Sequence, residues 1–543
     1  MHIRSRRIVA SLAVGLLGVF GLQAGITQAQ AKPPTATTPK RVMIVVVDAL
    51  SREIVKKYGM TTVQGLMDSG VNSPKGYLGH LGSVTVVTHN VLTTGVLPKH
   101  MGWTDDGYRD VDGVIGAPGG IWIPSDLTKD QMFALQTHAG HPKLADYLHT
   151  GRPGTHVYTV SPKRYAAWAY GGPTADSIIT FGSTVTCPDG KKYRATDGVN
   201  VPSYISTVCG RYYVPKLSAG AYDTGALPAS LYSVGDDRYV TGHDPAHAGG
   251  DIWATDAAID IMRNDSNWSG LFVTLPGVDK AAHMWGGVDD AGGADPMTHM
   301  KFATATADHQ ISRLLTELKT TDQLKDTLVV VTADHGSVAG RNFHGENPAT
   351  IDYGYYNWYY GSTLDGTYLQ PQAAIKPLTD TGNVALSYSD SMLRAWLTDT
   401  SPAKVKEAAA LMAKMPDVSA VWVRNGNHYD RVSNIKWRKM RHGAEKSWFA
   451  RHAQELVNTE AAAYGPEVIA TLVENTTYSV AGDHGGIQRQ TQQIPIIFAG
   501  AGVGSKDLQG AIRSVDIMPT ILKAMNIPVT SPLDGRAYRL SWP

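Results

Sequence analysis

The sequence predicts an α/β protein built on a mainly parallel central sheet flanked by helices. Three apolar runs support this prediction, and they span Arg41–Leu50, Gly270–Asp279 and Thr327–Gly336. Unbroken runs of Val, Ile and Leu are typical of strands that are buried on both faces, as in parallel sheets. Each run also carries an aspartate where the strand ends, at the carboxyl edge where open α/β sheets bind ligands.

The ends of the three runs carry side chains that suit a metal ion. Asp48 closes the first run, Asp279 closes the second, and Asp334 with His335 closes the third. His283 follows Asp279 by four residues, so both side chains share one face of a helix that begins after the second strand. Asp and His supply the oxygen and nitrogen ligands that zinc takes. Taken alone, an Asp-His pair at a strand end can equally serve only as a turn cap.

A further pair of this kind lies late in the chain. Asp483 and His484 occur in the stretch AGDHGG, and the apolar run IPIIFAG follows shortly after it. Three strands thus deliver carboxylates to one predicted edge of one sheet, and three histidines stand beside them. This density favours a shared metal site over unrelated turn caps.

The positions of these residues also bear on domain organisation. A chain of 543 residues suggests three domains by length alone. However, the candidate ligands run from Asp48 to His484, which favours one α/β domain at 41–543 with insertions at about 174–245 and 340–478, and we expect these insertions to form a cap over the site. The net charge of +1 gives no support for nucleic-acid binding or for a role at a membrane surface. The oligomeric state is left open.

The first residues have the pattern of a secretory signal peptide at 1–31. Basic residues precede an apolar run from Ile8 to Leu22, and Ala29-Gln30-Ala31 forms a small-residue cleavage site. The run is too short for a convincing membrane span, and no later stretch is long enough to span a bilayer. The SRRIVA stretch also resembles a twin-arginine signal, although ordinary signal peptides share this feature. We therefore expect an exported protein, secreted or periplasmic, with a flexible lead at 32–40.

The chain contains two cysteines, Cys187 and Cys209. In an oxidising compartment they are expected to form a disulfide, which contributes roughly 3 kcal/mol in the chain-entropy model. The alternative is a pair of unpaired buried thiols.

The segment Gly79–Trp103 is rich in glycine and hydroxyl groups and leads into a helix-like stretch that ends at Gly95. A threonine at the N-terminus of a helix lies among free backbone N–H groups, where a phosphate or a developing anion is stabilised. Thr85 and Thr88 are the candidates. Either residue considered alone can also be only an N-cap.

Taken together, these motifs resemble the alkaline phosphatase superfamily, and most closely its type I phosphodiesterase/nucleotide pyrophosphatase branch. The resemblance covers the catalytic core in the family's order, from Asp48 to His484. In this family a nucleophilic threonine lies ten residues before the glycine that closes its helix, with a histidine four residues after the threonine. Counting back from Gly95 gives Thr85, and His89 is present. The resemblance therefore implies Thr85 as the nucleophile.

The resemblance also implies two zinc ions as cofactors, although other divalent metals are compatible with the ligands. One ion would be held by Asp279, His283 and His484, and the other by Asp48, Asp334, His335 and Thr85.

Two departures from the family pattern concern substrate binding. The family has an asparagine after the nucleophile helix that donates to a phosphoryl oxygen, whereas this chain has Asp106, which cannot donate unless it is protonated. Threonine-dependent monoesterases of the superfamily carry a lysine and an arginine two residues apart. Lys163 matches the lysine, but Tyr165 replaces the arginine. Lys163 is either a ligand of a phosphoryl oxygen or a solvated surface residue.

These features predict an exported two-metal phosphoesterase that hydrolyses small-molecule phosphodiester or nucleotide-type substrates through a covalent threonine intermediate. An alkaline phosphomonoesterase is the first alternative, because Lys163 argues partly for monoesters. A non-catalytic protein that binds a metal or ligand on the same fold is the second, and Asp106 is the sequence feature that favours it. The identity of the leaving group is left open.

Overall fold

The computed structural model describes residues 38–186, 188, 192–205, 248–285, 287–288, 298–338, 342–343, 372–479 and 482–540. The chain divides into a unit Met1–Thr35 and a unit Ala36–Pro543, and all described residues belong to the second. The predicted signal peptide and both cysteines lie outside the described residues, so export and the disulfide stay predictions. No helix in the described ranges is both long enough and apolar enough to cross a bilayer.

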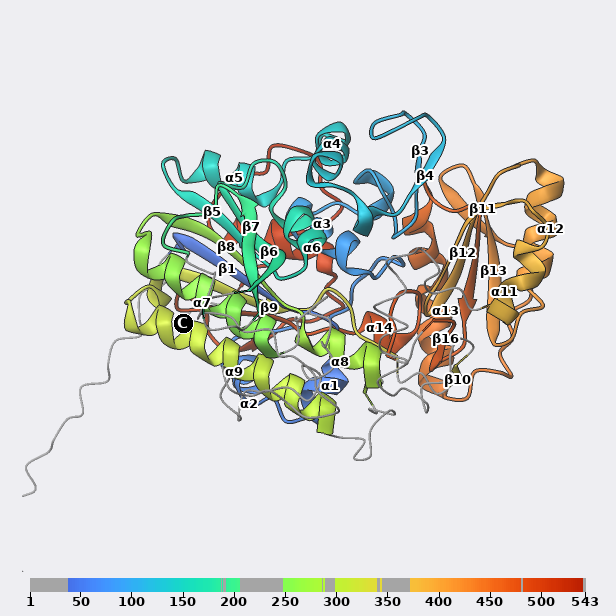
Figure 1. Ribbon diagram of the computed structural model, residues 1–543. Coiled ribbons are helices and arrows are strands. Elements are labelled where there is room, and N and C mark those ends of the chain that lie inside the picture. Colours follow the sequence, from blue (N-terminus) through green and yellow to red (C-terminus); the bar gives the residue numbers. More distant parts are fainter. Residues whose placement is uncertain are drawn as a thin grey trace, which may run out of the picture. The chain divides into compact units, whose positions relative to one another are not determined.

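A nine-stranded sheet forms the centre of the second unit, in the order β18-β2-β17-β9-β1-β8-β5-β6-β7 (Figure 1). Its strands are β1 (Arg41–Val47), β2 (Val71–Asn72), β5 (His156–Val160), β6 (Ser177–Thr186), β7 (Lys192–Val199), β8 (Trp268–Leu275), β9 (Thr327–Thr332), β17 (Ile496–Gly500) and β18 (Lys506–Asp507). The strands from β9 to β6 in this order are parallel, while β17 and β7 run antiparallel to their neighbours. The predicted mainly parallel sheet is confirmed.

The three apolar runs of the sequence form the middle of this sheet. β1 pairs with β9 on one side and with β8 on the other. All residues of β8 and β9 are buried, as is every residue of β1 after Arg41. Most side chains on both faces of these strands are apolar, and helices cover both faces.

Helices flank the sheet on both sides, with α3, α5 and α6 on one face and α2, α7 and α9 on the other (Figure 1). The helices of this layer are α1 (Arg52–Lys57), α2 (Thr61–Ser69), α3 (Thr85–Thr94), α4 (Lys129–Ala139), α5 (Leu144–Gly151), α6 (Arg164–Gly171), α7 (Ala248–Asn264), α8 (Gly277–Trp285), α9 (Thr298–Thr320), α14 (Arg489–Gln492) and α15 (Ile517–Ala524). Short 3₁₀ turns cover Pro98–His100, Pro124–Asp126, Leu324–Asp326, Asn458–Glu460 and Ser514–Asp516.

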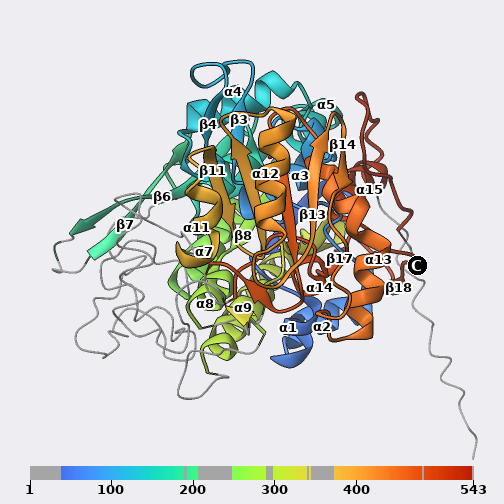
Figure 2. The same cartoon turned by 90° about the vertical axis from the view of Figure 1, so that its right-hand side faces the viewer.

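A second sheet lies within the region predicted as the larger insertion, with strand order β11-β12-β15-β13-β14 (Figure 2). Its strands are β11 (Val384–Ser389), β12 (Met392–Leu397), β13 (Val418–Asn425), β14 (His428–Arg431) and β15 (Val468–Leu472), and its helices are α11 (Gln372–Thr379), α12 (Pro402–Met412) and α13 (Gly443–Val457). Two-stranded sheets pair β3 (Tyr108–Asp110) with β4 (Gly120–Trp122) and β10 (Asn342–Phe343) with β16 (Thr476–Thr477).

The smaller predicted insertion, at about 174–245, was expected to form a cap over the site. Its first part belongs to the central sheet instead. Its first part forms β6 and β7, and β6 pairs in parallel with β5 of the central sheet. The residues from Ser177 to Val199 therefore extend the central sheet. Most of the remaining insertion, from 206 to 245, lies outside the described residues.

Substitution of Leu271 by alanine tests the central packing. Leu271 lies in β8, has no exposed surface, and is flanked by Met43 and Tyr158 on the neighbouring strands. The truncation leaves a cavity in a close-packed layer, so the free energy of unfolding should fall by about 2–5 kcal/mol in urea denaturation. The control Val529→Ala changes a side chain that is 48% exposed. It should cost less than about 0.5 kcal/mol, and equal losses for the two variants would contradict this account.

Candidate active site

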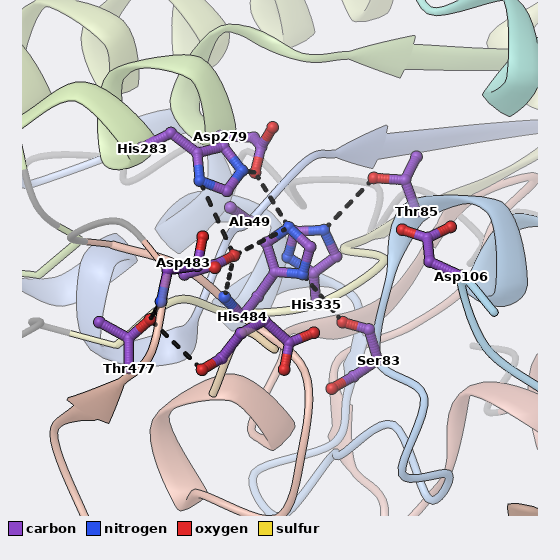
Figure 3. Close-up of polar contacts among 12 residues, drawn as sticks. Ala49, Ser83, Thr85, Asp106, Asp279, His283, His335, Thr477, Asp483 and His484 are labelled. Atoms are coloured by element: carbon purple, nitrogen blue, oxygen red, sulfur yellow. Dashed lines mark hydrogen bonds and ion pairs between the residues drawn. The ribbon is translucent and has the colours of Figure 1, made fainter. Parts of the chain in front are cut away.

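The sheet topology brings the predicted ligands to one edge. Because β9, β1 and β8 are parallel neighbours, the residues that follow them emerge at the same edge: Asp48 after β1, Asp334 and His335 after β9, and Asp279 in the helix after β8. β17 runs antiparallel to β9, so its beginning lies at this edge as well. The segment before β17 delivers His484 there. Figure 3 shows Asp279, His335 and His484 converging.

The first cluster of side chains contains Asp48, Asp334 and His335, all of them fully buried. His335 Nε2 lies 3.3 Å from Asp48 Oδ1 and 3.6 Å from Asp334 Oδ2. Asp334 Oδ1 accepts hydrogen bonds from the backbone N–H groups of Ala49 and His335, which leaves Oδ2 directed at the imidazole. Thr85 Oγ1 lies 3.4 Å from the same His335 nitrogen. The four predicted ligands of this metal are therefore together.

The second cluster contains Asp279, His283 and His484. His283 Nε2 lies 3.1 Å and His484 Nε2 lies 3.7 Å from Asp279 Oδ1. Asp279 and His283 both belong to α8, as their spacing of four residues predicted. The His335 and His484 rings stack with centroids 3.6 Å apart, so the two clusters adjoin.

The donor set fits divalent cations. Asp48 Oδ1, Asp279 Oδ1 and Asp334 Oδ2 are buried, and none of them has a well-formed hydrogen bond among the described residues. Burial raises the pKa of Asp48 well above its usual value, and the charges of Asp279 and Asp334 raise it further. Buried carboxylates of this kind require a cation. The facing atoms are carboxylate oxygens and imidazole nitrogens, which are zinc ligands.

Lys163 is part of the site. Its ammonium lies 2.6 Å from Asp48 Oδ2 and 2.7 Å from Asp279 Oδ2, and its side chain is only 4% exposed. The alternative of a solvated surface lysine is therefore wrong, because Lys163 is the N-cap residue of α6 and is directed inward from there. Tyr165, at the position where the resemblance expected an arginine, is partly buried against the apolar side chains around α3.

Thr85 is the first residue of α3, and Val84 is its N-cap. Neither Thr85 nor Thr88 caps the helix, so that alternative is wrong for both residues. Thr88 Oγ1 lies 3.4 Å from His80 Nε2, whereas Thr85 faces His335. Helix geometry explains the difference, because residues three apart are offset around the helix axis.

His89 supports the first turn of α3. His89 Nδ1 lies 2.8 Å from the carbonyl oxygen of Thr85, and Nε2 lies 2.9 Å from Thr274 Oγ1 in β8. Burial lowers the pKa of His89 to about 4, so its ring is neutral at pH 7. A neutral imidazole between these two partners fixes the start of α3 against the central sheet.

A buried lysine that the sequence reasoning missed ties α3 to α6. The Lys143 ammonium donates to Asn90 Oδ1 at 2.6 Å and to the Ala169 carbonyl at 2.8 Å. Gln136 reaches the same two acceptors through its amide. Lys143 and Gln136 therefore join α3, which begins at Thr85, to α6, which follows Lys163, by hydrogen bonds away from the N-termini of the two helices. A lysine after a proline gives no sequence signal for this role.

The loop that carries Asp106 rests on a charged network from the second sheet. Arg394 in β12 has its Nε 2.7 Å from Asp105 and its Nη1 2.7 Å from Asp390. Asp105 and Arg394 have no exposed surface. The Tyr388 hydroxyl donates to Asp106 Oδ2 at 3.3 Å. The sequence analysis missed these contacts because nothing local indicates that the insertion packs against the loop after α3.

Asp106 differs from an ordinary surface carboxylate. The pKa of Asp106 is raised to about 7, first by burial and then by the neighbouring Asp105 charge, while Arg394 opposes both effects. A substantial fraction of Asp106 is therefore protonated at neutral pH, and a protonated carboxyl can donate a hydrogen bond. Figure 3 shows Asp106 and Thr85 on the same side of the site.

Comparison with known proteins agrees with this geometry. Residues 42–353, more than half of the chain, match the model of the family described as type I phosphodiesterase/nucleotide pyrophosphatase. The chain belongs to this family of the alkaline phosphatase superfamily, which confirms the resemblance seen in the sequence.

Among curated proteins, the chain is similar to alkaline phosphatase PhoK of Sphingomonas sp, with 23% identity over 560 residues that cover 94% of this chain and 92% of the relative. Among solved structures, wild-type alkaline phosphatase PafA matches with a TM-score of 0.58 and 15% identity, over 92% of this chain and 98% of that chain. Murine ectonucleotide pyrophosphatase/phosphodiesterase 5 matches with a TM-score of 0.51 and 13% identity, over 91% and 97% of the two chains. These likenesses support the alkaline phosphatase-like fold.

Substitution of Arg394 by methionine tests the charged network. The variant leaves the buried carboxylates of Asp105 and Asp390 without their cation, and removing one partner of a buried pair typically costs about 3–5 kcal/mol. We expect a loss of this size in chemical denaturation. The control Arg313→Met removes an ion pair with Asp256 in which the arginine is 31% exposed. It should cost less than about 1 kcal/mol, and a similarly small loss for Arg394→Met would refute a structural role for the network.

Proposed function

We propose that this protein is an exported, two-metal phosphoesterase that hydrolyses phosphodiester or nucleotide-type substrates through a covalent threonine intermediate. The observation that carries the proposal is the position of Thr85. Its hydroxyl lies 3.4 Å from His335 Nε2, next to the buried Asp48 and Asp334 carboxylates and at the N-terminus of α3. Membership of the phosphodiesterase family supports the class of reaction.

The proposed ligands form two sets. Asp279, His283 and His484 would hold the first metal, and Asp48, Thr85, Asp334 and His335 would hold the second. When bound, two divalent cations, which we propose to be zinc, lower the pKa of the threonine hydroxyl and stabilise the departing oxygen.

The residues of the chain then have distinct roles in phosphoryl transfer. Thr85 Oγ attacks phosphorus in line, the bond to the leaving alcohol breaks, and a phosphorylated threonine forms. Water attacks that phosphorus in the second step, and the Thr85 hydroxyl is regenerated. Lys163, which contacts Asp48 and Asp279, would hold a non-bridging oxygen. Protonated Asp106 would donate to another.

The substrate class separates two versions of the proposal. Tyr165 in place of an arginine favours diesters, since one cation fewer is available for a doubly charged monoester. Lys163 at the centre of the site favours a phosphomonoesterase as the second candidate. We propose comparing kcat/KM for bis-nitrophenyl phosphate and for nitrophenyl phosphate on zinc-loaded protein. Higher values for the diester support the first version, and higher values for the monoester support the second.

Substitution of Thr85 by alanine tests the covalent mechanism. The variant lacks the nucleophile, so kcat should fall at least about 1,000-fold while bound metal is retained. The control Thr88→Ala removes a hydroxyl one turn away that faces His80, and it should stay within about tenfold of the wild type. A Thr85→Ala enzyme with wild-type turnover would exclude a threonine intermediate. Wild-type protein that binds metal and hydrolyses neither ester would instead support the non-catalytic alternative.

Substitution of Asp106 by asparagine tests the donor role through its pH dependence. Asp106, with a pKa of about 7, donates when it is protonated below this pH and repels a phosphoryl oxygen when it is ionised above it. Asparagine donates at every pH. The ratio of kcat/KM for Asp106→Asn over wild type should therefore be about 1 at pH 6 and rise about tenfold by pH 8. The control Asp112→Asn alters a carboxylate that is 66% exposed. A flat ratio for Asp106→Asn would rule out the proposed donor.

A further inference from the structure

We propose that Glu460 positions the nucleophile loop of the candidate active site and does so as a neutral carboxylic acid. The nucleophile loop is residues 79–84, which lead directly into Thr85 at the start of α3. Glu460 closes the 3₁₀ turn Asn458–Glu460, in the region predicted as the larger insertion. The inference rests on the two-metal function proposed above and adds a positioning residue that lies outside both ligand sets.

The nucleophile loop is held by two consecutive side chains of the insertion. The Gly82 N–H donates to Glu460 Oε1 at 2.8 Å, and the Leu81 N–H donates to Thr459 Oγ1 at 2.9 Å. A Cβ at Gly82 would lie 2.9 Å from Glu460 Oε1 and 2.3 Å from the Thr104 carbonyl oxygen. A glycine is therefore required for this close approach. Glu460 thus fixes the backbone three residues before Thr85.

The same loop contacts a candidate metal ligand. His484 Nδ1 lies 3.2 Å from the Ser83 carbonyl oxygen (Figure 3). The Gly486 N–H donates to the Leu81 carbonyl at 3.0 Å. A histidine that binds a metal through Nε2 is oriented by the hydrogen bond of its other ring nitrogen, and backbone carbonyls are common acceptors for it. A nucleophile loop held by Glu460 therefore orients His484 as well as the start of α3.

The burial of Glu460 indicates that its carboxyl group carries a proton. Glu460 has no exposed surface, and its Oε2 has no hydrogen-bond partner among the described residues. Arg394 forms its ion pairs with Asp105 and Asp390. None of the candidate metal groups in the described part of the chain includes Glu460. A buried carboxyl group that has neither a paired cation nor a metal is neutralised by a proton instead.

The electrostatic surroundings of Glu460 favour the same state. Burial first, and then the charge of Asp105, raise the pKa of Glu460 well above its usual value, although Arg394 opposes the shift. The two neighbouring phenols donate elsewhere, Tyr429 to the Pro466 carbonyl and Tyr464 to the Pro98 carbonyl. The neutral acid keeps Oε1 as an acceptor for the Gly82 N–H.

Two substitutions of Glu460 test the positioning role. Glutamine has the shape of the neutral acid and keeps an oxygen that accepts from the Gly82 N–H, whereas alanine removes the acceptor. On zinc-loaded protein, kcat for the better of the two nitrophenyl esters should stay within about threefold of wild type for Glu460→Gln and fall at least about tenfold for Glu460→Ala. KM should change less than about threefold in both variants, because the nucleophile moves and the substrate contacts remain.

Infrared spectroscopy in D₂O tests the protonation state without relying on turnover. The difference spectrum between wild type and Glu460→Gln at pH 7 should contain the C=O stretching band of a protonated carboxyl group. Glu467→Gln is the matched control, because Glu467 is a buried glutamate of the same region that pairs with Arg109 and Arg424. Its difference spectrum should contain carboxylate bands. Carboxylate bands for Glu460→Gln would overturn the neutral state of Glu460.

The outcomes separate this inference from the proposed function. If wild type hydrolyses esters and Glu460→Ala has wild-type kcat, the positioning role is wrong and the proposed function stands. If Glu460→Ala does not fold, Glu460→Gln decides, since a folded glutamine variant with kcat reduced more than about tenfold contradicts the role assigned to the neutral acid. If zinc-loaded wild type hydrolyses no ester, the two-metal function fails, and the infrared spectra still decide whether Glu460 is protonated.

Discussion

Carboxylates that are removed from water need a nearby cation, and this requirement governs the edge of the central sheet. Asp48, Asp279, Asp334 and Asp483 are all buried there. Lys163 contacts two of these carboxylates directly. One ammonium does not balance four carboxylates, so the site is built for additional positive charge. The same surplus of negative charge suits divalent metals and keeps Lys163 protonated.

The second sheet also supplies a cation to buried carboxylates, at a place away from the candidate metal ligands. Arg394 extends from β12 and meets Asp105 and Asp390 in a buried network. Asp390 in turn lies against the loop that carries His484. A Cβ at the next residue, Gly485, would lie 2.5 Å from the Asp390 carboxylate. One arginine thus links the strand hairpin, the loop of Asp106 and the loop of His484. The region that looked like an insertion in the sequence is an integral support of the site.

Most of the candidate metal centre could be predicted because its signals are local in the chain. Continuous apolar runs indicate buried strands, and the residue after each parallel strand lies at the carboxyl edge of the sheet. Asp279 and His283 share a helix face because they are four residues apart. The contacts of Lys143 with α3 and of Arg394 with Asp105 join residues far apart in sequence. No local pattern encodes such pairs, since each depends on which surfaces meet after folding.

The sequence by itself determined the class of fold, because continuous apolar runs depend on the chain alone, and it predicted the candidate metal ligands and Thr85 from their spacing and from the family resemblance. The tertiary structure alone decided that Lys163 is buried between two carboxylates and that Asp106 lies in surroundings that raise its pKa. It alone also placed Asp483 opposite His283. The physical reason is that burial and electrostatic surroundings are properties of the packed assembly, whereas periodicity and spacing are properties of the chain.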